Sequence, residues 1–277
     1  MAQISETNHR PAFTLSVLIA VLAVIASAGG LSLNGLYRDN TFVTSAWKGN
    51  DVITLFLAVP LLVMAMIFSK RGSLKAQLVW MGMLDYMLYN YAFYLFGATF
   101  NWFFLLYIAL LVLSIFALIL GLLGLDTDKI SQHAQKRMPV KWIAGYLLFV
   151  AVGLTLIYVA QSVGFIFTGQ LPAIVAKTEH PTSIVFALDL TLLVPFLVLG
   201  GLWLLRRKPW GFVLAGIYTV KGPLYTLVLT AGSLWASNVG VEGAGSEVPL
   251  WILLTVLGLI AALLFYRSIS ISLKESS

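Results

Sequence analysis

Apolar runs of about 20 residues, separated by short polar segments, fill most of the chain between residues 13 and 269. A helix that crosses a membrane needs about 20 consecutive, mostly apolar residues. A transmembrane β-barrel would instead show alternating segments of about 10 residues, a pattern that this chain does not have. The runs therefore predict an all-α polytopic membrane protein with eight transmembrane helices, at Phe13–Leu33, Val52–Ser69, Gln77–Ala98, Trp102–Leu125, Trp142–Phe167, Ser183–Leu205, Phe212–Trp235 and Leu250–Ile269.

The composition agrees with residence in a lipid bilayer and argues against several kinds of metal-binding and catalytic site. Of the 277 residues, 60% are hydrophobic and only 10% are charged, whereas about 25% are charged in an ordinary soluble domain. The chain has no cysteine, which excludes disulfides and thiolate metal ligands, and its three histidines are scattered. Neither a phosphate-binding loop motif nor a serine-elbow motif is present. We therefore predict no cofactor, no metal site and no catalytic residue.

The basic residues alternate between the predicted loops. If the N-terminus is cytoplasmic, most of the 17 Lys and Arg residues fall in inner segments, and the outer loops hold only Arg38, Lys48 and Lys177. Cytoplasmic loops of membrane proteins carry an excess of Lys and Arg. Both termini are thus expected to be cytoplasmic. Topology also explains the net charge of +6, so no nucleic-acid partner is predicted.

The two halves of the chain align with each other at an offset of 135 residues. The stretch LFLAVPLLV at Leu55–Val63 lies over LTLLVPFLV at Leu190–Val198, with six of nine residues identical. One extra residue in the following inner loop would place Asp85 over Lys221. Two four-helix repeats in parallel orientation are related by an axis along the membrane normal, and binding sites often lie at the repeat interface. The predicted organisation is a cytoplasmic N-terminus at 1–12, a first repeat at 13–125, a cytoplasmic linker at 126–141, a second repeat at 142–269 and a cytoplasmic tail at 270–277.

Three ionisable side chains fall inside the predicted spans: Asp85, Asp189 and Lys221. Each costs about 2.5–3.5 kcal/mol at the centre of a bilayer even on the lenient insertion scale. Because the repeat places Asp85 and Lys221 at equivalent positions, we expect them to form an ion pair. The pair could belong to a ligand or ion pathway, or it could be purely structural, and a third alternative is a lysine that reaches water without a partner. The sequence Gly222-Pro223 next to this lysine predicts a kink or a break in the helix.

The third span contains DYMLYNYAFY, which is unusually polar for a membrane helix. Its tyrosines and asparagine recur at spacings of three and four residues, which places them on one broad helical face. They could line a polar, aromatic cavity, or they could form ordinary hydrogen bonds between helices. The candidate ligand-binding residues are therefore Lys221, Asp85, Asp189, Asn90, Tyr86 and Tyr89.

The segment WKGND, Trp47–Asp51, precedes the second span. We interpret it as a glycine turn followed by Asn50 or Asp51 as the N-cap of the helix, with Trp47 at the outer membrane boundary. The alternative is an outer entrance that Asn50 and Asp51 would form with three other polar residues, Asn34, Tyr37 and Asn101.

Four short motifs resemble a group of uncharacterised bacterial multi-pass membrane proteins. They are W-x-G-N-D at residues 47–51, R-G-S at 71–73, Y-N-Y at 89–91 and F-G-x-x-F-N at 96–101. The resemblance covers about Asn34–Leu125. It implies a location in the bacterial cytoplasmic membrane and an eight-helix fold, and it implies no activity.

The tandem repeat, the charges inside the spans and the absence of an ATPase motif favour a secondary transporter or permease for a small solute, with a polar site at the repeat interface. The alternative is a non-catalytic membrane sensor or a structural subunit of a larger complex. An enzyme is less favoured, because no activated nucleophile is evident beyond a desolvated lysine. The expected partners are the lipid bilayer and a small-molecule or ion ligand, and the sequence carries no signal for an oligomeric state.

Overall fold

The computed structural model describes residues 3–134 and 136–270, and 83% of these residues are helical. The described part contains no β-strand, only an isolated bridge between Ala134 and Ile269. The prediction of an all-α fold is confirmed. In order, the helices are α1 (Gln3–Ser32), α2 (Thr41–Ile53), the π-helical η1 (Thr54–Ala58), α3 (Val59–Lys70), α4 (Leu74–Gly97), α5 (Phe104–Leu123), α6 (Thr127–His133), α7 (Val140–Thr168), α8 (Ala173–Thr178), α9 (Ile184–Leu188), the π-helical η2 (Asp189–Leu193), α10 (Val194–Leu205), α11 (Pro209–Asn238), the 3₁₀-helical η3 (Ala244–Glu247) and α12 (Val248–Arg267).

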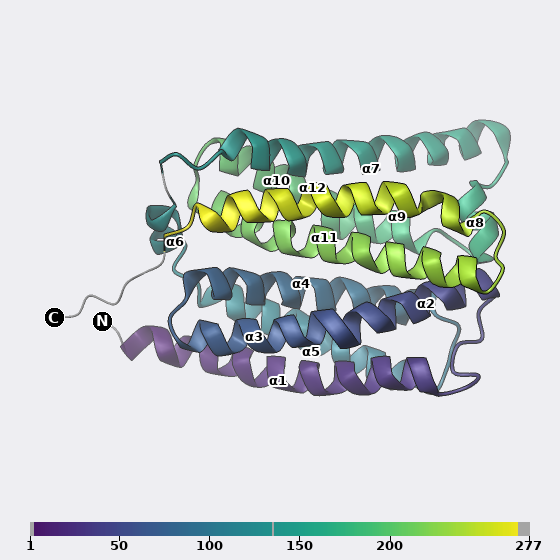
Figure 1. Ribbon diagram of the computed structural model, residues 1–277, viewed down its shortest axis with the longest axis horizontal. Coiled ribbons are helices and arrows are strands. Elements are labelled where there is room, and N and C mark those ends of the chain that lie inside the picture. Colours follow the sequence, from purple (N-terminus) through teal and green to yellow (C-terminus); the bar gives the residue numbers. More distant parts are fainter. Residues whose placement is uncertain (1–2, 135, 271–277) are drawn as a thin grey trace.

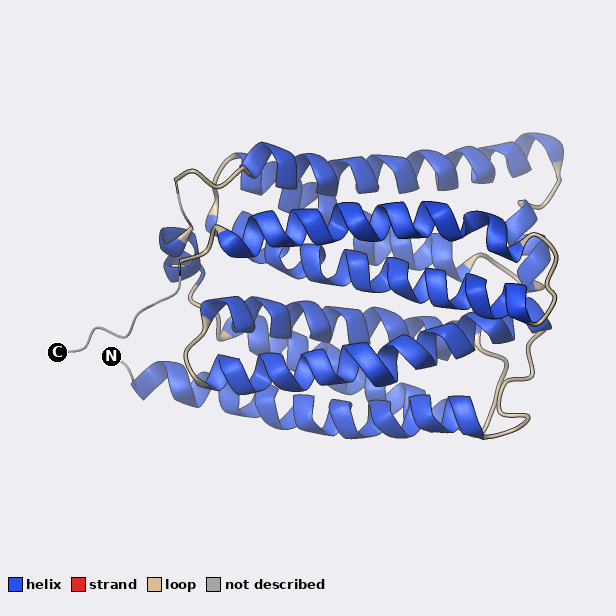
Figure 2. Cartoon of the chain, in the orientation of Figure 1, coloured by secondary structure: helices blue, strands red, loops and turns tan. Residues whose placement is uncertain are grey.

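The long helices lie side by side in one elongated bundle (Figure 1). Helices α1, α3, α4 and α5 gather on one side, and α7, α10, α11 and α12 gather on the other. The loops are confined to the two ends of the bundle (Figure 2). Helices α4 and α11 contact each other, so they join the two groups along the middle of the molecule.

Seven helical segments are long and apolar enough to cross a membrane, which supports a multi-pass membrane protein. They are Arg10–Ser32, Thr41–Lys70, Phe104–Leu123, Val140–Thr168, Ile184–Leu205, Pro209–Asn238 and Ala244–Arg267.

Helix α4, predicted as the third span, forms over 24 residues but is not one of these seven apolar segments. Most of its side chains are buried, because α3, α5 and α11 pack around it. A helix that neighbouring helices shield on all sides has no need of an apolar surface, which explains its tyrosines, Asp85 and Asn90.

Two helices contain a π-helical turn immediately before a proline. The N–H of Val59 donates to the carbonyl of Thr54, and the N–H of Val194 donates to the carbonyl of Asp189, so both turns are one residue wider than an α-helical turn. Pro60 and Pro195 follow these turns directly. Proline lacks an N–H and its ring crowds the preceding turn, and π-bulges of this kind are frequent at functional sites. Both turns have the same length and are separated by 135 residues along the chain.

The turn after each of these helices is also built alike. The N–H of Ser73 donates to the carbonyl of Phe68, and the N–H of Lys208 donates to that of Trp203, at 3.2 and 2.9 Å. The preceding residues, Gly72 and Arg207, both have a positive φ, as the left-handed position of a helix C-terminus requires. The two turns have equal length, so the extra residue that we expected in the second one is not there.

The second transmembrane segment begins earlier than predicted. Helix α2 begins at Thr41, and its N-cap is Asn40, whose side chain accepts from the N–H of Val43. The segment WKGND lies inside this helix, so the predicted glycine turn and the predicted caps at Asn50 and Asp51 are wrong. A Cβ at Gly49 would overlap the backbone of Gly232 in α11. Glycine occurs there because two helices cross closely.

Helix α11 continues without interruption from Pro209 to Asn238, so the predicted break at Pro223 is wrong. The ring of Pro223 lies against α12 where that helix has Gly258. A Cβ at Gly258 would lie only 3.0 Å from the proline Cδ. Glycine at this position therefore leaves room for the proline ring where α11 and α12 pack together.

Candidate functional site

Asp85 and Lys221 form a buried ion pair between α4 and α11, as predicted. The ammonium nitrogen of Lys221 lies 2.8 Å from Oδ2 of Asp85. Lys221 is 2% exposed and Asp85 is 8% exposed. An unpaired buried charge is costly, whereas a paired one is tolerated, so each residue makes the other acceptable at this depth.

Two aromatic rings lie close to the Lys221 ammonium. It lies 4.5 Å from the ring centroid of Tyr89 and 5.5 Å from that of Tyr218. The negative face of an aromatic ring attracts a cation, and the attraction is stronger when water is excluded. These rings therefore add to the stabilisation that Asp85 provides.

Asp189 belongs to the same group of side chains. It begins the π-helical turn η2, and its two carboxylate oxygens accept hydrogen bonds from the hydroxyls of Tyr89 and Tyr158, at 2.5 and 2.8 Å. Lys221 also interacts electrostatically with Asp189. We call Asp85, Asp189, Lys221, Tyr89 and Tyr158 the charged locus. Tyr158 was not predicted, because it lies in an otherwise apolar helix and only folding brings it to Asp189.

Two predicted site residues, Tyr86 and Asn90, lie apart from the charged locus. The hydroxyl of Tyr86 contacts Thr54 and Asn50 of the segment formed by α2 and η1, at 2.8 and 3.2 Å. The amide of Asn90 makes no hydrogen bond with the described residues. Of the two alternatives for the polar residues of α4, hydrogen bonding between helices is the one that Tyr86 and Tyr89 show. Because α4 is surrounded by other helices, its polar side chains are divided among several neighbours.

Comparisons with protein-family models, with curated proteins and with solved structures found no match to this chain. The functional interpretation therefore depends on the geometry of the chain itself.

A second buried carboxylate, Asp51 of α2, was predicted only as a cap or as part of an entrance. It is 2% exposed and accepts hydrogen bonds from the hydroxyls of Tyr37 and Tyr94, at 2.6 and 2.8 Å. Burial, with the nearby Asp51 carboxylate, raises the pKa of Tyr37 well above its ordinary value of 10. Tyr37 thus keeps its proton and remains a donor to Asp51.

The position of Asp51 inside a helix could have been predicted from the residues before it. Asp39 and Asn40 are good N-cap residues, and Thr41–Trp47 contains no helix breaker, so a helix that begins at Thr41 was compatible with the sequence. The misleading signal was Gly49, which we interpreted as a turn. The alternative entrance is also unsupported by burial, since Asn50 is 0% exposed.

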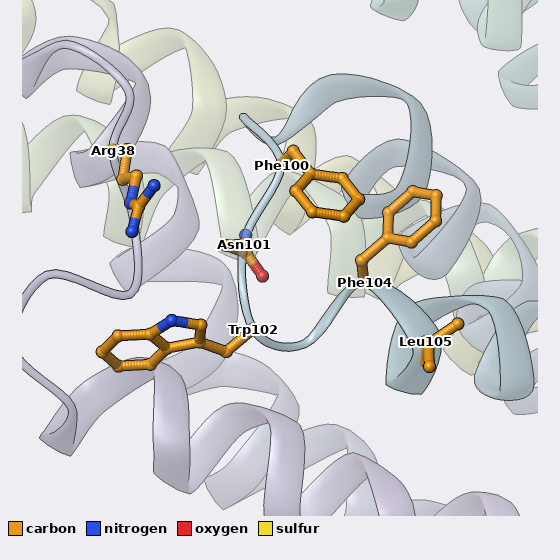
Figure 3. Close-up of a pocket in the computed structure, with 6 residues that line it drawn as sticks. All are labelled: Arg38, Phe100, Asn101, Trp102, Phe104 and Leu105. Carbon is orange, nitrogen blue, oxygen red and sulfur yellow. The ribbon is translucent and has the colours of Figure 1, made fainter.

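Two surface pockets lie away from the charged locus. One pocket of about 640 Å³ lies at the end of the bundle where the α1–α2 and α4–α5 loops meet, lined by Arg38, Phe100, Asn101, Trp102, Phe104 and Leu105 (Figure 3). A second, of about 270 Å³, lies between α7 and Val198 of α10. Neither pocket is lined by Asp85, Asp189 or Lys221.

The chemistry of the charged locus suits charge neutralisation better than catalysis. It has one cation, two carboxyl groups and phenol donors, with no base beside a nucleophile. Among the described residues, no three His, Cys, Asp or Glu side chains are grouped as metal ligands. A site of this kind can hold the positive charge of Lys221 in the interior of the bundle. It also offers that charge two carboxyl groups, Asp85 and Asp189, as alternative partners.

Proposed function

We propose that the chain is an eight-span protein of the bacterial cytoplasmic membrane, formed by two four-helix units that derive from one duplicated unit. The equal spacing of the two π-helical turns and of the two following backbone turns supports this proposal.

We propose that both termini are cytoplasmic. Helix α1 begins, and helix α12 ends, at one end of the bundle, and the α3–α4 and α10–α11 turns lie at that same end (Figure 1). These turns carry clustered basic residues, such as Lys70, Arg71 and Arg206–Lys208. The excess of positive charge favours a cytoplasmic location for this end.

The proposed function is secondary transport of a small solute, with the charged locus as the polar site between the two units. The observation that carries this proposal is the pair of π-helical, proline-containing interruptions at corresponding positions of the two halves. Interrupted helices at corresponding positions are the sequence feature that best indicates a binding site in transporters with internal repeats. The second interruption begins with Asp189, a member of the charged locus.

Transport requires the charged locus to become accessible to water, and the absence of native cysteine makes this easy to test. We would introduce Tyr225→Cys, on α11 about one turn beyond Lys221, partly buried and packed against Tyr89 of the charged locus. The protein in vesicles would be exposed to a membrane-impermeant thiol reagent from either side. Slow labelling from both sides supports alternating access, whereas protection from both sides contradicts the transporter proposal.

Two control variants make the labelling result interpretable. Leu62→Cys lies fully buried on α3 and should remain unlabelled. Ser246→Cys lies exposed in the short η3, at the end of the bundle, and should label rapidly, from one side only.

A second candidate function is a structural or sensory subunit. It is favoured by the direct 2.8 Å contact between Lys221 and Asp85 and by pockets that do not reach them. A purely structural pair should tolerate exchange of its members. If Asp85→Lys combined with Lys221→Asp restores both folding and Tyr225→Cys protection to the wild-type level, the structural role is favoured.

A further inference from the structure

Asp51 is a buried carboxylate that forms no ion pair among the described residues. Lys48, three residues earlier on α2, interacts with it electrostatically, but the Lys48 ammonium donates its hydrogen bonds to the carbonyls of Gly30 and Leu31. Of the buried aspartates, Asp85 contacts Lys221 directly, and Asp189 has the same lysine nearby. Leaving an ionised carboxylate uncompensated in an apolar interior is costly. Asp51 can avoid this cost by keeping its proton or by binding a cation directly, and the second arrangement requires further oxygen ligands around it.

Oxygen atoms surround this carboxylate. Tyr37 and Tyr94 donate hydrogen bonds to it, and the Tyr94 hydroxyl also lies 3.1 Å from the carbonyl oxygen of Trp47. Gly30 of α1 leaves the necessary space, because a Cβ there would overlap both Oδ2 of Asp51 and the hydroxyl of Tyr37. Each of these oxygens keeps at least one lone pair.

Two further tyrosine hydroxyls lie nearby and are not used in hydrogen bonds. Tyr91 and Tyr107 are 1% and 2% exposed, and both interact electrostatically with Asp51. Ser27 faces the first hydroxyl and Tyr37 and Asn101 face the second, but none forms a well-aligned hydrogen bond with it. The ring of Tyr94 packs against both of these rings, at 5.9 and 5.1 Å. The arrangement thus provides buried oxygen atoms that remain available to a ligand.

We propose that this group, Asp51 with Tyr37, Tyr91, Tyr94 and Tyr107, binds a sodium ion. Hard cations take oxygen ligands such as carboxylates, hydroxyls and carbonyls. A single carboxylate balances one positive charge, so a monovalent cation fits better than a divalent one. The group contains no nitrogen or sulfur ligand of the kind that transition metals prefer. This site lies in the first unit and does not depend on the proposed transport function.

The test is the thermal stability of the purified protein in detergent, measured in sodium, potassium and choline chloride at equal ionic strength. A ligand that binds only the folded state raises the unfolding temperature in a concentration-dependent manner. We expect a saturable rise in sodium chloride and a smaller one or none in the other salts. An equal response in all three salts would show a general salt effect and overturn the proposal.

Matched variants locate the response. Asp51→Asn should abolish it, whereas Asp189→Asn, which changes another buried carboxylate held by two tyrosines, should retain it. Loss in Asp189→Asn with retention in Asp51→Asn would overturn the proposed location. If Asp51→Asn does not fold, Tyr107→Phe removes one unused hydroxyl and should shift the sodium response to higher concentration. An unchanged response in that variant would also contradict the proposed ligand set.

Discussion

The two halves of the bundle resemble each other in backbone and differ in chemistry. Each has a π-helical turn, a proline and a tight turn at matching distances along the chain. The first of these π-helical turns begins with Thr54 and the second with Asp189, and both residues contact tyrosines of α4, namely Tyr86 and Tyr89. The irregular backbone is therefore not a by-product of one particular polar residue. It is common to both halves, and only one of them places an acid on it.

The buried acids show a parallel difference. Asp85 and Asp189 lie near Lys221 at the contact between the halves, whereas Asp51 lies within the first half, where it accepts hydrogen bonds from two tyrosines and forms no ion pair with Lys48. Charge at the contact between halves can be balanced by a residue from the other half. Charge inside one half must be balanced locally or by a ligand.

The largest effect is expected from removing the cation at the contact between the halves. Lys221→Met leaves Asp85 buried without its partner, and breaking a buried pair in this way costs about 3–5 kcal/mol. The free energy of unfolding in mixed micelles, measured against wild type, would show the loss.

The double variant Lys221→Met with Asp85→Asn is the control for this effect. Because it removes both charges, it should recover most of the loss. If Lys221→Met alone unfolds as wild type does, the pair contributes nothing to holding the halves together.

Much of the fold could be predicted from the sequence, because hydrophobicity determines which segments enter a membrane. The positions of seven apolar helices followed from apolar length. The Asp85–Lys221 pair followed from the cost of an isolated charge, although the alignment that placed these two residues opposite each other contained an extra residue that the structure lacks. These inferences depend on the hydrophobicity and the charge of each residue, which do not change with its position in the structure.

The remainder depended on contacts between distant segments. Gly49 indicates a turn when considered by its local sequence, and only the crossing of α2 with Gly232 shows why it is glycine. In the same way, Tyr158 and Tyr37 could not be assigned to carboxylates that lie 31 and 14 residues away in the sequence. The division of the polar residues of α4 among several neighbours also required the packing.

An intermediate effect is expected where the halves cross most closely. Gly49→Ala places a methyl group against the backbone of Gly232, which cannot move as a flexible side chain could, and overpacking of this kind costs about 1–3 kcal/mol. Unfolding in mixed micelles again measures the loss.

Gly145→Ala is the matched control, since nothing lies within 4 Å of a Cβ at that helical position. It should be neutral or slightly stabilising, because alanine favours a helix over glycine. Equal stability of the two variants would mean that the α2–α11 crossing is looser than the structure indicates.

The smallest effect compares the two prolines that follow the π-helical turns. Proline restricts the unfolded chain, so replacing it with alanine where its backbone geometry is suitable should lower the free energy of unfolding by about 0.4–1 kcal/mol. Pro60 and Pro195 occupy the same position relative to their π-helical turns, so Pro60→Ala and Pro195→Ala should produce equal losses in the same unfolding measurement. Equal losses would mean that the backbone interruption has the same energetic role in both halves, independent of whether Thr54 or Asp189 begins it. A much larger loss for Pro195→Ala would mean instead that the acid and its tyrosines depend on the wide turn, and that the resemblance between the halves does not extend to how the two interruptions are stabilised.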